Sequence, residues 1–131
     1  MFFQIDPANG LALYEQVVRQ VKFAVADELL QPGQLVPSVR EVARELAINP
    51  NTVARAYREL QADRVLESIR GTGLAVAAGA DKRCRAERVQ LIRARLERVL
   101  IEARQSGLNG GELRTLIDEL LAVVQREEVS A

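Results

Sequence analysis

Hydrophobic residues recur at helical intervals in the first part of the chain. Between Ala12 and Leu30 they stand at positions 14, 17, 18, 21, 25 and 29, and such steps of three and four residues mark one face of a helix. Gln31-Pro32-Gly33 is a helix stop, and Asn9-Gly10 marks a turn before the helix. We expect this helix to close the core behind the two helices that follow, and residues 1–8 to form a short extended segment.

A short amphipathic helix is predicted next, from Val39 to about Ala47. Ser38 precedes it and Glu41 lies three residues further on, which is the capping box in which each side chain satisfies an amide that the helix end leaves unpaired. Pro37 forces the residue before it out of the helical region, so the start of the helix is sharply placed. Ile48 is expected to fill the core between this helix and the next one.

The following helix begins at a second cap. Asn49 is a good N-cap residue, and Pro50 suits the first helical position because the N–H that proline lacks has no partner there. Helical spacing gathers apolar residues on one face, namely Val53, Ala56, Tyr57 and Leu60. The opposite face is narrow and polar, and it carries Asn51, Arg55 and Arg58, flanked by Thr52 and Ala54.

The polar face has the residue types that read DNA. Arginine can hold guanine through two parallel hydrogen bonds, asparagine can pair similarly with adenine, and a threonine methyl group can touch thymine. The plainer alternative is that Arg55 and Arg58 only solvate a surface helix. The capped helix and tight turn before them favour a helix-turn-helix, which places its second helix in the DNA major groove.

A glycine-tipped hairpin follows the helix pair. Residues 65–69 and 74–76 are short strands with β-branched content, and Arg70-Gly71-Thr72-Gly73 between them is a turn. Glycines at this turn let backbone amides approach a phosphate, and Arg70 can reach a phosphate or a minor groove. A plain hairpin with a solvated arginine is the alternative, but the position directly after the helix pair favours a wing.

Two further helices are predicted in the last third of the chain. After a short linker at 77–80, Asp81 is expected to cap a long helix that ends near Gln105. Glycine and polar residues at 106–111 break this helix. Asn109 with Glu112 then forms a second capping signature, and the last helix reaches about Arg126.

Both of these helices carry wide apolar stripes, which two antiparallel helices alone cannot bury. We expect the same helical hairpin of a second protomer to cover them in a C₂ four-helix arrangement. The alternative is that the hairpin packs back on its own N-terminal domain. We name the nine residues predicted to form the dimer interface the tail stripe: Val89, Ile92, Leu96, Val99, Leu113, Leu116, Ile117, Leu120 and Val124.

The predicted fold is therefore mainly α with a small β-wing. Residues 1–79 are expected to form a winged helix-turn-helix domain that binds DNA, and residues 80–131 an α-helical dimerisation domain. The net charge is zero and the isoelectric point is near 6.4, which argues against unspecific coating of nucleic acid. A protein that reads bases in a DNA groove needs only local clusters of basic residues. Most of the basic residues here are arginines, which suit bidentate hydrogen bonds.

The sequence offers no basis for catalysis or metal binding. It has no histidine and one cysteine, Cys84, so it supports neither a zinc site nor a nucleophile–base pair nor an internal disulfide. P-loop and Rossmann fingerprints are absent, and neither a signal-peptide pattern nor an apolar run of membrane-spanning length is present. We expect a cytoplasmic protein that is not an enzyme and needs no cofactor or metal, with no special role for Cys84.

Several spaced motifs resemble one family. PSVREVARELAINPNTVARAYREL at 37–60, followed by RGTGLAV at 70–76, is similar to the DNA-binding domain of GntR-type bacterial transcription regulators. The Asn-Pro-Asn-Thr turn and the pair Ala56-Tyr57 resemble the YtrA-type branch. The lead-in, with LYEQV at 13–17 and PGQL at 32–35, agrees, and the resemblance covers about residues 4–77.

With the dimer expected from the apolar stripes, this resemblance leads us to expect a sequence-specific, homodimeric repressor that blocks polymerase at a pseudo-palindromic operator. It implies DNA contacts at nine positions: Ser38, Arg40, Asn51, Thr52, Arg55, Arg58, Arg70, Thr72 and Gly73. The family usually has glycine where this chain has Arg64. Its wing usually ends in threonine-phenylalanine-valine, where this chain has Leu74-Ala75-Val76. The alternative function is a protein-interaction or architectural module whose winged fold has no operator specificity.

Overall fold

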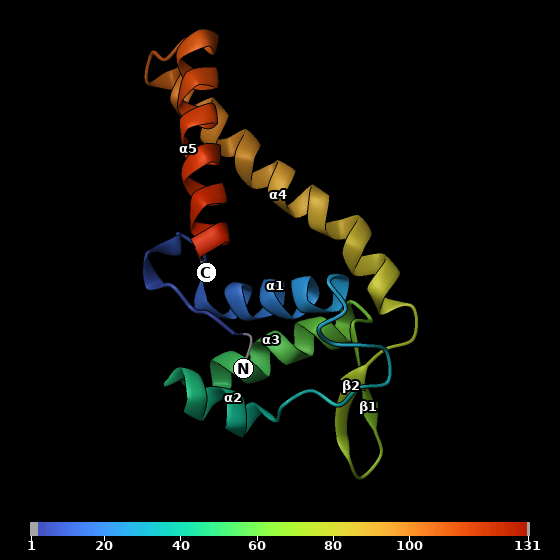
Figure 1. The fold of residues 1–131 in the computed structure, drawn as a ribbon. Coiled ribbons are helices and arrows are strands. Elements are labelled where there is room, and N and C mark those ends of the chain that lie inside the picture. Colours follow the sequence, from blue (N-terminus) through green and yellow to red (C-terminus); the bar gives the residue numbers. More distant parts are fainter. Residues whose placement is uncertain (1–2, 131) are drawn as a thin grey trace. The chain divides into compact units, whose positions relative to one another are not determined.

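The computed structural model describes residues 3–130, with side chains to residue 127, and it consists of helices with one small hairpin (Figure 1). The element order is η1 (Pro7–Asn9), α1 (Leu13–Ala26), α2 (Val39–Leu46), α3 (Pro50–Ala62), β1 (Leu66–Ile69), β2 (Gly73–Val76), α4 (Ala80–Gln105) and α5 (Gly110–Ser130). The chain divides into two compact units, and the boundary between them falls between Val89 and Gln90, inside α4. The predicted fold class, mainly α with a small β-wing, is confirmed.

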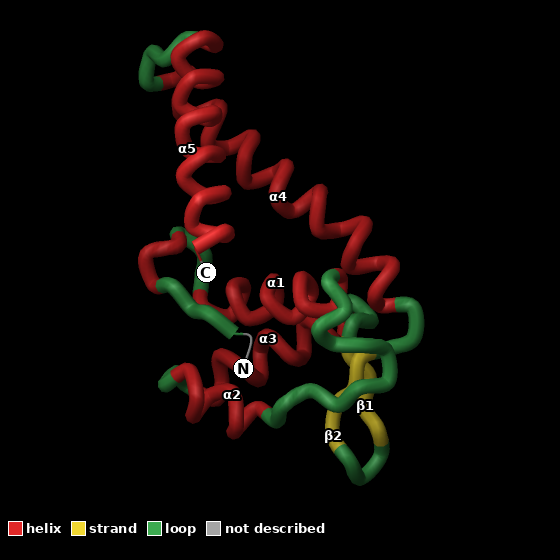
Figure 2. The backbone as a smooth tube through the Cα atoms, viewed as in Figure 1, coloured by secondary structure: helices red, strands yellow, loops and turns green. Residues whose placement is uncertain are grey.

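The first unit holds the buried core. Helices α1 and α2 both pack on α3, and β1 also contacts α3, as the ribbon and tube show (Figures 1 and 2). The largest fully buried side chains come from these elements, from the residue before β1, from β2 and from the start of α4: Val17, Val21, Val25, Val42, Val53, Leu60, Val65, Leu66, Val76 and Cys84. Helix α1 therefore closes the core behind α2 and α3, as predicted.

Helix α1 ends at Ala26, so the prediction that it continues to Leu30 is wrong. Glu28 adopts a left-handed backbone with φ of 64°, and the amides of Leu29 and Leu30 both turn back to the carbonyl of Ala24. Position 29 belongs to the predicted apolar face, but the turn exposes Leu29, at 65%, and buries Leu30 in its place. The segment before α1 also differs from the expectation, since residues 7–9 form a 3-10 turn.

Helices α2 and α3 begin as predicted, and α2 ends at Leu46, beside the predicted end near Ala47. Ser38 Oγ accepts the Glu41 amide at 3.1 Å, and Glu41 Oε1 accepts the Ser38 amide at 3.3 Å, which completes the capping box. Asn49 caps α3, with Pro50 at its first position. Ile48 packs against the core between the two helices. These caps fix where the tight turn lies and how α3 is presented.

The wing consists of β1, β2 and the turn between them. The strands are antiparallel, with Leu66 paired to Val76 and Ile69 paired to Gly73. An isolated bridge between Leu35 and Ala75 joins the segment before α2 to β2. The start of α2 is therefore attached to the wing as well as to α3.

Arg64, between α3 and β1, has a positive φ of 60°. The family resemblance places glycine at this position, and the left-handed backbone found there explains why glycine suits it. A side chain costs free energy in this conformation because its Cβ approaches the following carbonyl oxygen. The Arg64 carbonyl oxygen accepts a hydrogen bond from the guanidinium of Arg83.

The start of α4 belongs to the first unit. The helix begins at Ala80, so Asp81 lies in its first turn and is not its cap, contrary to the prediction. The reason is that the Gly79 carbonyl already accepts the first helical bond, from the Arg83 amide, while Ala80 is fully buried. Asp81 instead faces Arg85 at 3.4 Å. Desolvation raises the pKa of Asp81, but the backbone amide of Lys82 and the guanidinium of Arg85 together lower it by more.

A buried lysine connects three helices of this unit. Lys22 of α1 lies 3.0 Å from Asp63, which caps the end of α3, and 2.9 Å from Glu87 of α4. Burial lowers the pKa of Lys22, but the hydrogen bonds to Glu87 and Asp63 raise it by more, so the lysine stays charged. The first two turns of α4 are thereby fixed to the winged part of the chain.

The second unit, residues 90–131, contains the rest of α4 and α5. The predicted capping signature is present, since Asn109 Oδ1 accepts the Glu112 amide at 2.9 Å and Glu112 Oε1 accepts the Asn109 amide at 3.2 Å. Helix α5 continues to Ser130, beyond the predicted end at Arg126, because no glycine or proline interrupts it. Within the described residues, no helix is long and apolar enough to cross a membrane.

Candidate nucleic-acid interface

Helix α3 presents the polar face that the sequence predicted. Val53, Ala56, Tyr57 and Leu60 are buried, and this fixes the rotation of the helix. The residues on the opposite side are Asn51, Thr52, Arg55 and Arg58, which we call the reading face; Thr52 is half-buried and the other three are exposed. The face starts at the helix N-terminus, where the positive end of the helix dipole favours the phosphates of a nucleic acid.

Tyr57 links this helix to the start of α2. Its hydroxyl donates a hydrogen bond of 2.7 Å to the carbonyl oxygen of Pro37. Burial raises the pKa of Tyr57, and the charge of Glu41 raises it further, so the hydroxyl remains a donor at neutral pH. The contact joins residues far apart in sequence, and periodicity placed Tyr57 only on the apolar face.

The predicted contacts of α2 lie at its N-terminus. Ser38 is the cap, and its oxygen is engaged with the Glu41 amide, while Arg40 is exposed in the first turn. The wing tip carries the exposed residues Arg70, Thr72 and Gly73. The amide of Thr72 donates to the Ile69 carbonyl at 3.0 Å, which closes the turn.

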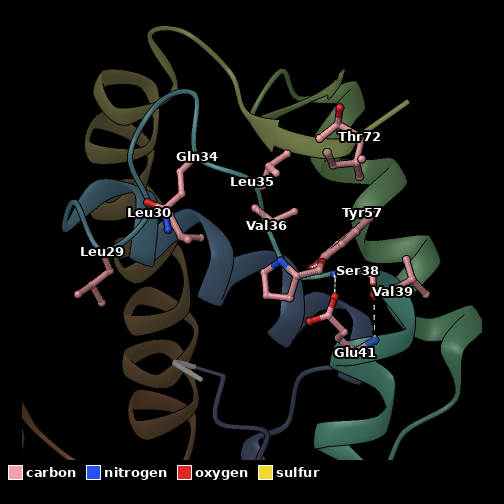
Figure 3. Close-up of a pocket in the computed structure, with 13 residues that line it drawn as sticks. Leu29, Leu30, Gln34, Leu35, Val36, Ser38, Val39, Glu41, Tyr57 and Thr72 are labelled. Carbon is pink, nitrogen blue, oxygen red and sulfur yellow. Dashed lines mark hydrogen bonds between the residues drawn. The ribbon is translucent and has the colours of Figure 1, made fainter. Parts of the chain in front are cut away.

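A groove of about 720 Å³ lies between the start of α2 and the wing (Figure 3). It is lined by Ser38, Thr72 and Gly73 among others, so the structure brings together predicted contacts from two elements. A second depression, of about 450 Å³, is lined by Leu13, Tyr14, Asn51, Thr52 and Arg55. Arg40, Arg58 and Arg70 line neither of these two hollows.

The second depression includes residues from α1 that sequence reasoning did not assign to the interface. The guanidinium carbon of Arg55 lies 3.7 Å from the ring centroid of Tyr14. Tyr14 stands at a predicted apolar position of its helix, and only the packing of α1 on α3 brings it beside the reading face. No local signal in the sequence links the two residues.

The tail stripe is largely uncovered in the single chain. Val89, Ile92, Leu96 and Val99 of α4 are between 48% and 58% exposed. On α5, Leu116, Leu120 and Val124 are exposed, whereas Leu113 and Ile117 are half-buried. An apolar surface of this kind is typical of a face that contacts another protein.

Sequence comparisons relate the chain to transcription regulators. The family model described as "Bacterial regulatory proteins, gntR family" matches residues 13–76. The HTH-type transcriptional repressor YtrA of Bacillus subtilis is 34% identical over 122 residues, which are 93% of this chain and 94% of that protein.

Solved structures of the same kind have a similar fold. A GntR family transcriptional regulator from Listeria monocytogenes matches with a TM-score of 0.69 and 26% identity, over 88% of this chain and 98% of that one. YtrA from Sulfolobus acidocaldarius, a GntR-family transcription factor, matches with a TM-score of 0.58 and 28% identity, over 72% of this chain and 97% of that one. The similarity to both the B. subtilis and the L. monocytogenes protein extends beyond the residues that the family model matches.

Proposed function

This chain belongs to the GntR family of bacterial regulatory proteins and is a DNA-binding transcriptional regulator, and we propose that it acts as a homodimeric repressor on a pseudo-palindromic operator. In this proposal α3 enters the major groove, the wing and the start of α2 hold the flanking backbone, and α4 with α5 joins two protomers. Since its partner is chromosomal DNA, we place the protein in the cytoplasm.

The observation that carries the proposal is the reading face of α3. It is polar, it starts at a helix N-terminus, and it is held by four buried residues on the opposite side of the same helix. Arg55 and Asn51 provide donors and an acceptor for base edges, and Thr52 adds a methyl group for thymine. We assign base reading to this face, with Arg55 as its main residue.

Contacts to phosphate are assigned to the elements around α3. Arg40 stands in the first turn of α2, and the bridge between Leu35 and Ala75 holds that turn in a fixed position beside the wing. Arg70, Thr72 and Gly73 stand exposed at the wing tip. Phosphate contacts position a protein on the duplex, whereas contacts to base edges supply the sequence preference.

The dimer is proposed from the uncovered tail stripe. A second copy of the same helical hairpin is the simplest surface that covers apolar residues on both α4 and α5, and two-fold symmetry makes each patch its own partner. A two-fold dimer with one reading helix per protomer requires two half-sites related by the same axis. Repression then follows from competition with polymerase for the same DNA, which agrees with the repressor name of the B. subtilis relative.

Selection of DNA from a random pool by the full-length protein tests this function. We expect enrichment of one inverted repeat. The centres of its two half-sites should lie about 10 base pairs apart, or a multiple of that distance, and a footprint should cover both half-sites. The selected site should also occur upstream of genes whose transcription rises when the protein is removed. A pool without an enriched sequence would reject operator recognition and favour the architectural or protein-interaction module.

A further inference from the structure

We infer that Tyr14 of α1 is a positioning residue for DNA reading, because its ring holds the guanidinium of Arg55 in the orientation in which Arg55 meets the operator. The inference rests on the proposed function of α3 and adds a residue from outside the helix-turn-helix. It predicts that the sequence preference of this protein depends on an aromatic ring at position 14.

The contact has the geometry of a cation–π pair. The Arg55 guanidinium carbon lies 3.7 Å from the centroid of the Tyr14 ring, well inside the range of about 6 Å over which a ring face attracts a cation. The two residues belong to different helices, Tyr14 to the first turn of α1 and Arg55 to α3. The packing of α1 against α3 therefore sets the position of the guanidinium.

Stacking leaves the arginine able to bind a base. A ring contacts only the flat face of the guanidinium, and the N–H groups point outward in its plane. In the part of the chain whose side chains are described, Arg55 has no carboxylate partner that would occupy those donors. A guanidinium held by its face and free at its edge is prepared for the two parallel bonds that guanine accepts.

The ring that holds Arg55 is itself fixed. Tyr14 is half-buried and packs against the hydrophobic core of the first unit. Its hydroxyl donates to Glu15 Oε1 at 3.2 Å, so the polar end of the side chain is also engaged. The depression beside it is lined by Asn51 and Thr52 as well as Arg55, which places the stacked pair among the other residues of the reading face.

Arg58 provides the comparison within the same helix. It is exposed, three residues after Arg55, and no ring contact is found for it among the described residues. A free arginine loses more side-chain freedom when it binds than one already held in place. Within the reading face the structure therefore distinguishes Arg55, which is stacked on a ring, from Arg58, which is exposed without such a contact, and Arg55 is the better prepared of the two for base reading.

The test is a double-mutant cycle with the full-length protein. The probe is a duplex that carries the sequence selected by the parent protein, and the reference is a duplex of scrambled sequence at the same salt concentration. The variants are Tyr14→Leu, Tyr14→Phe, Arg55→Ala and the double variant Tyr14→Leu/Arg55→Ala, with Arg58→Ala as the matched arginine control. Thermal melting reports whether each variant is folded.

We expect Tyr14→Leu to weaken binding to the selected duplex about 2- to 30-fold, the range of a cation–π contact, with little change on the scrambled duplex. Tyr14→Phe keeps the ring and should bind like the parent. In the Arg55→Ala background, Tyr14→Leu should have no further effect, whereas it should keep its full effect in the Arg58→Ala background.

Two results would overturn the role of Tyr14. One is an equal loss from Tyr14→Leu with and without Arg55, because Tyr14 then acts independently of that arginine. The other is parental binding by Tyr14→Leu where Arg55→Ala binds weakly, because Arg55 then needs no ring. Failure of the proposed function has a separate signature, since the parent protein itself would not distinguish the selected duplex from the scrambled one.

Discussion

The two units of this chain use their hydrophobic residues in opposite ways. In the first unit the apolar positions of α1, α2, α3 and the wing are buried together, with side chains such as Val17, Val53 and Leu60 at 0% exposure. In the second unit a regular apolar stripe runs along both helices, and residues such as Leu96 and Leu120 are more than half exposed. The first unit buries its apolar residues within one chain, whereas the second leaves its stripe largely uncovered.

The difference indicates a division of tasks. A unit with its own core can hold side chains in a fixed geometry, and base reading requires such geometry. A unit with an uncovered stripe gains its stability from association, because two helices joined by a short turn bury too little on their own. We therefore attribute the reading of DNA to the first unit and the spacing of two readers to the second.

The largest predicted effect comes from removing the second unit. A fragment of residues 1–89 retains Ala80, Cys84 and Glu87, which are buried in or paired with the winged unit, and it should be a folded monomer. Its affinity for the operator should fall by about two orders of magnitude or more, because the second half-site no longer binds at a high effective concentration. Titration of the operator with both proteins measures this loss.

Salt dependence gives the same experiment a second readout. A dimer that contacts roughly 6–10 phosphates should show a log–log slope of about −5 to −9, and the fragment about half of that. Equal slopes for the two proteins would contradict a second reader, and equal affinities would assign no DNA-binding role to the tail. A shorter fragment, residues 1–79, should melt at a lower temperature than residues 1–89, because it loses the buried start of α4.

The next largest effect distinguishes base contacts from phosphate contacts within the first unit. Arg55→Ala should cost about 1–3 kcal/mol on the operator and relax the preference at one base pair, whereas Arg40→Ala should weaken all sequences about equally and reduce the salt slope. Titrations on the operator and on single-base variants measure both. If Arg55→Ala binds the operator as tightly as the parent does, the assignment of base reading to Arg55 is wrong.

A smaller effect is expected at Lys22, which attaches α4 to the winged unit. Lys22→Met should lower the free energy of unfolding by about 1 kcal/mol, since it leaves Asp63 and Glu87 without their partner but both carboxylates remain partly solvated. The raised pKa of Lys22 means that its contribution is complete below the ordinary value of 10.5 and is lost as the pH rises through the folded-state pKa.

Denaturant titrations of the parent and of Lys22→Met at pH 7 and at strongly alkaline pH check this prediction. The difference between the two proteins should be largest at pH 7 and should shrink at the higher pH. A difference that does not change with pH would show that Lys22 contributes through packing and not through its charge.

An effect of similar size but opposite sign is expected at Arg64, where the backbone has a positive φ. Arg64→Gly should stabilise the protein by about 1 kcal/mol, because glycine adopts this conformation without the steric penalty that Cβ causes. DNA binding should change little, since Arg64 is not among the predicted contacts. The melting temperature is the readout, and a decrease would mean that the arginine side chain makes stabilising contacts that outweigh the strain.

The helices that could be predicted well from sequence are those with explicit caps. Ser38 with Glu41 and Asn49 with Pro50 set the starts of α2 and α3, since each satisfies backbone groups locally. The end of α1 was missed because Glu28 takes a left-handed backbone, which an acidic residue does not signal. The small residues at 77–80 predicted a linker. Alanines also fit a closely packed core, and in the structure Ala77 and Ala80 are buried in it.

The parts of the candidate site that could not be predicted are contacts between distant segments. The stacking of Arg55 on Tyr14 and the hydrogen bond from Tyr57 to Pro37 both depend on how helices pack. Periodicity identifies the buried face of each helix but not which residues of two faces meet. The nine proposed DNA contacts remain predictions, now placed on the α2 start, the reading face and the wing tip.

The central claim is that the tail stripe joins two copies of this chain, and sedimentation of the full-length protein tests it most directly. At tens of micromolar the parent should sediment as a dimer, while Leu120→Glu, which puts a charge in the stripe, should dissociate it. Glu119→Gln, at an exposed neighbouring position, should leave the dimer intact. A parent protein that sediments as a monomer at every concentration would contradict the dimer and, with it, the argument for a two-fold operator.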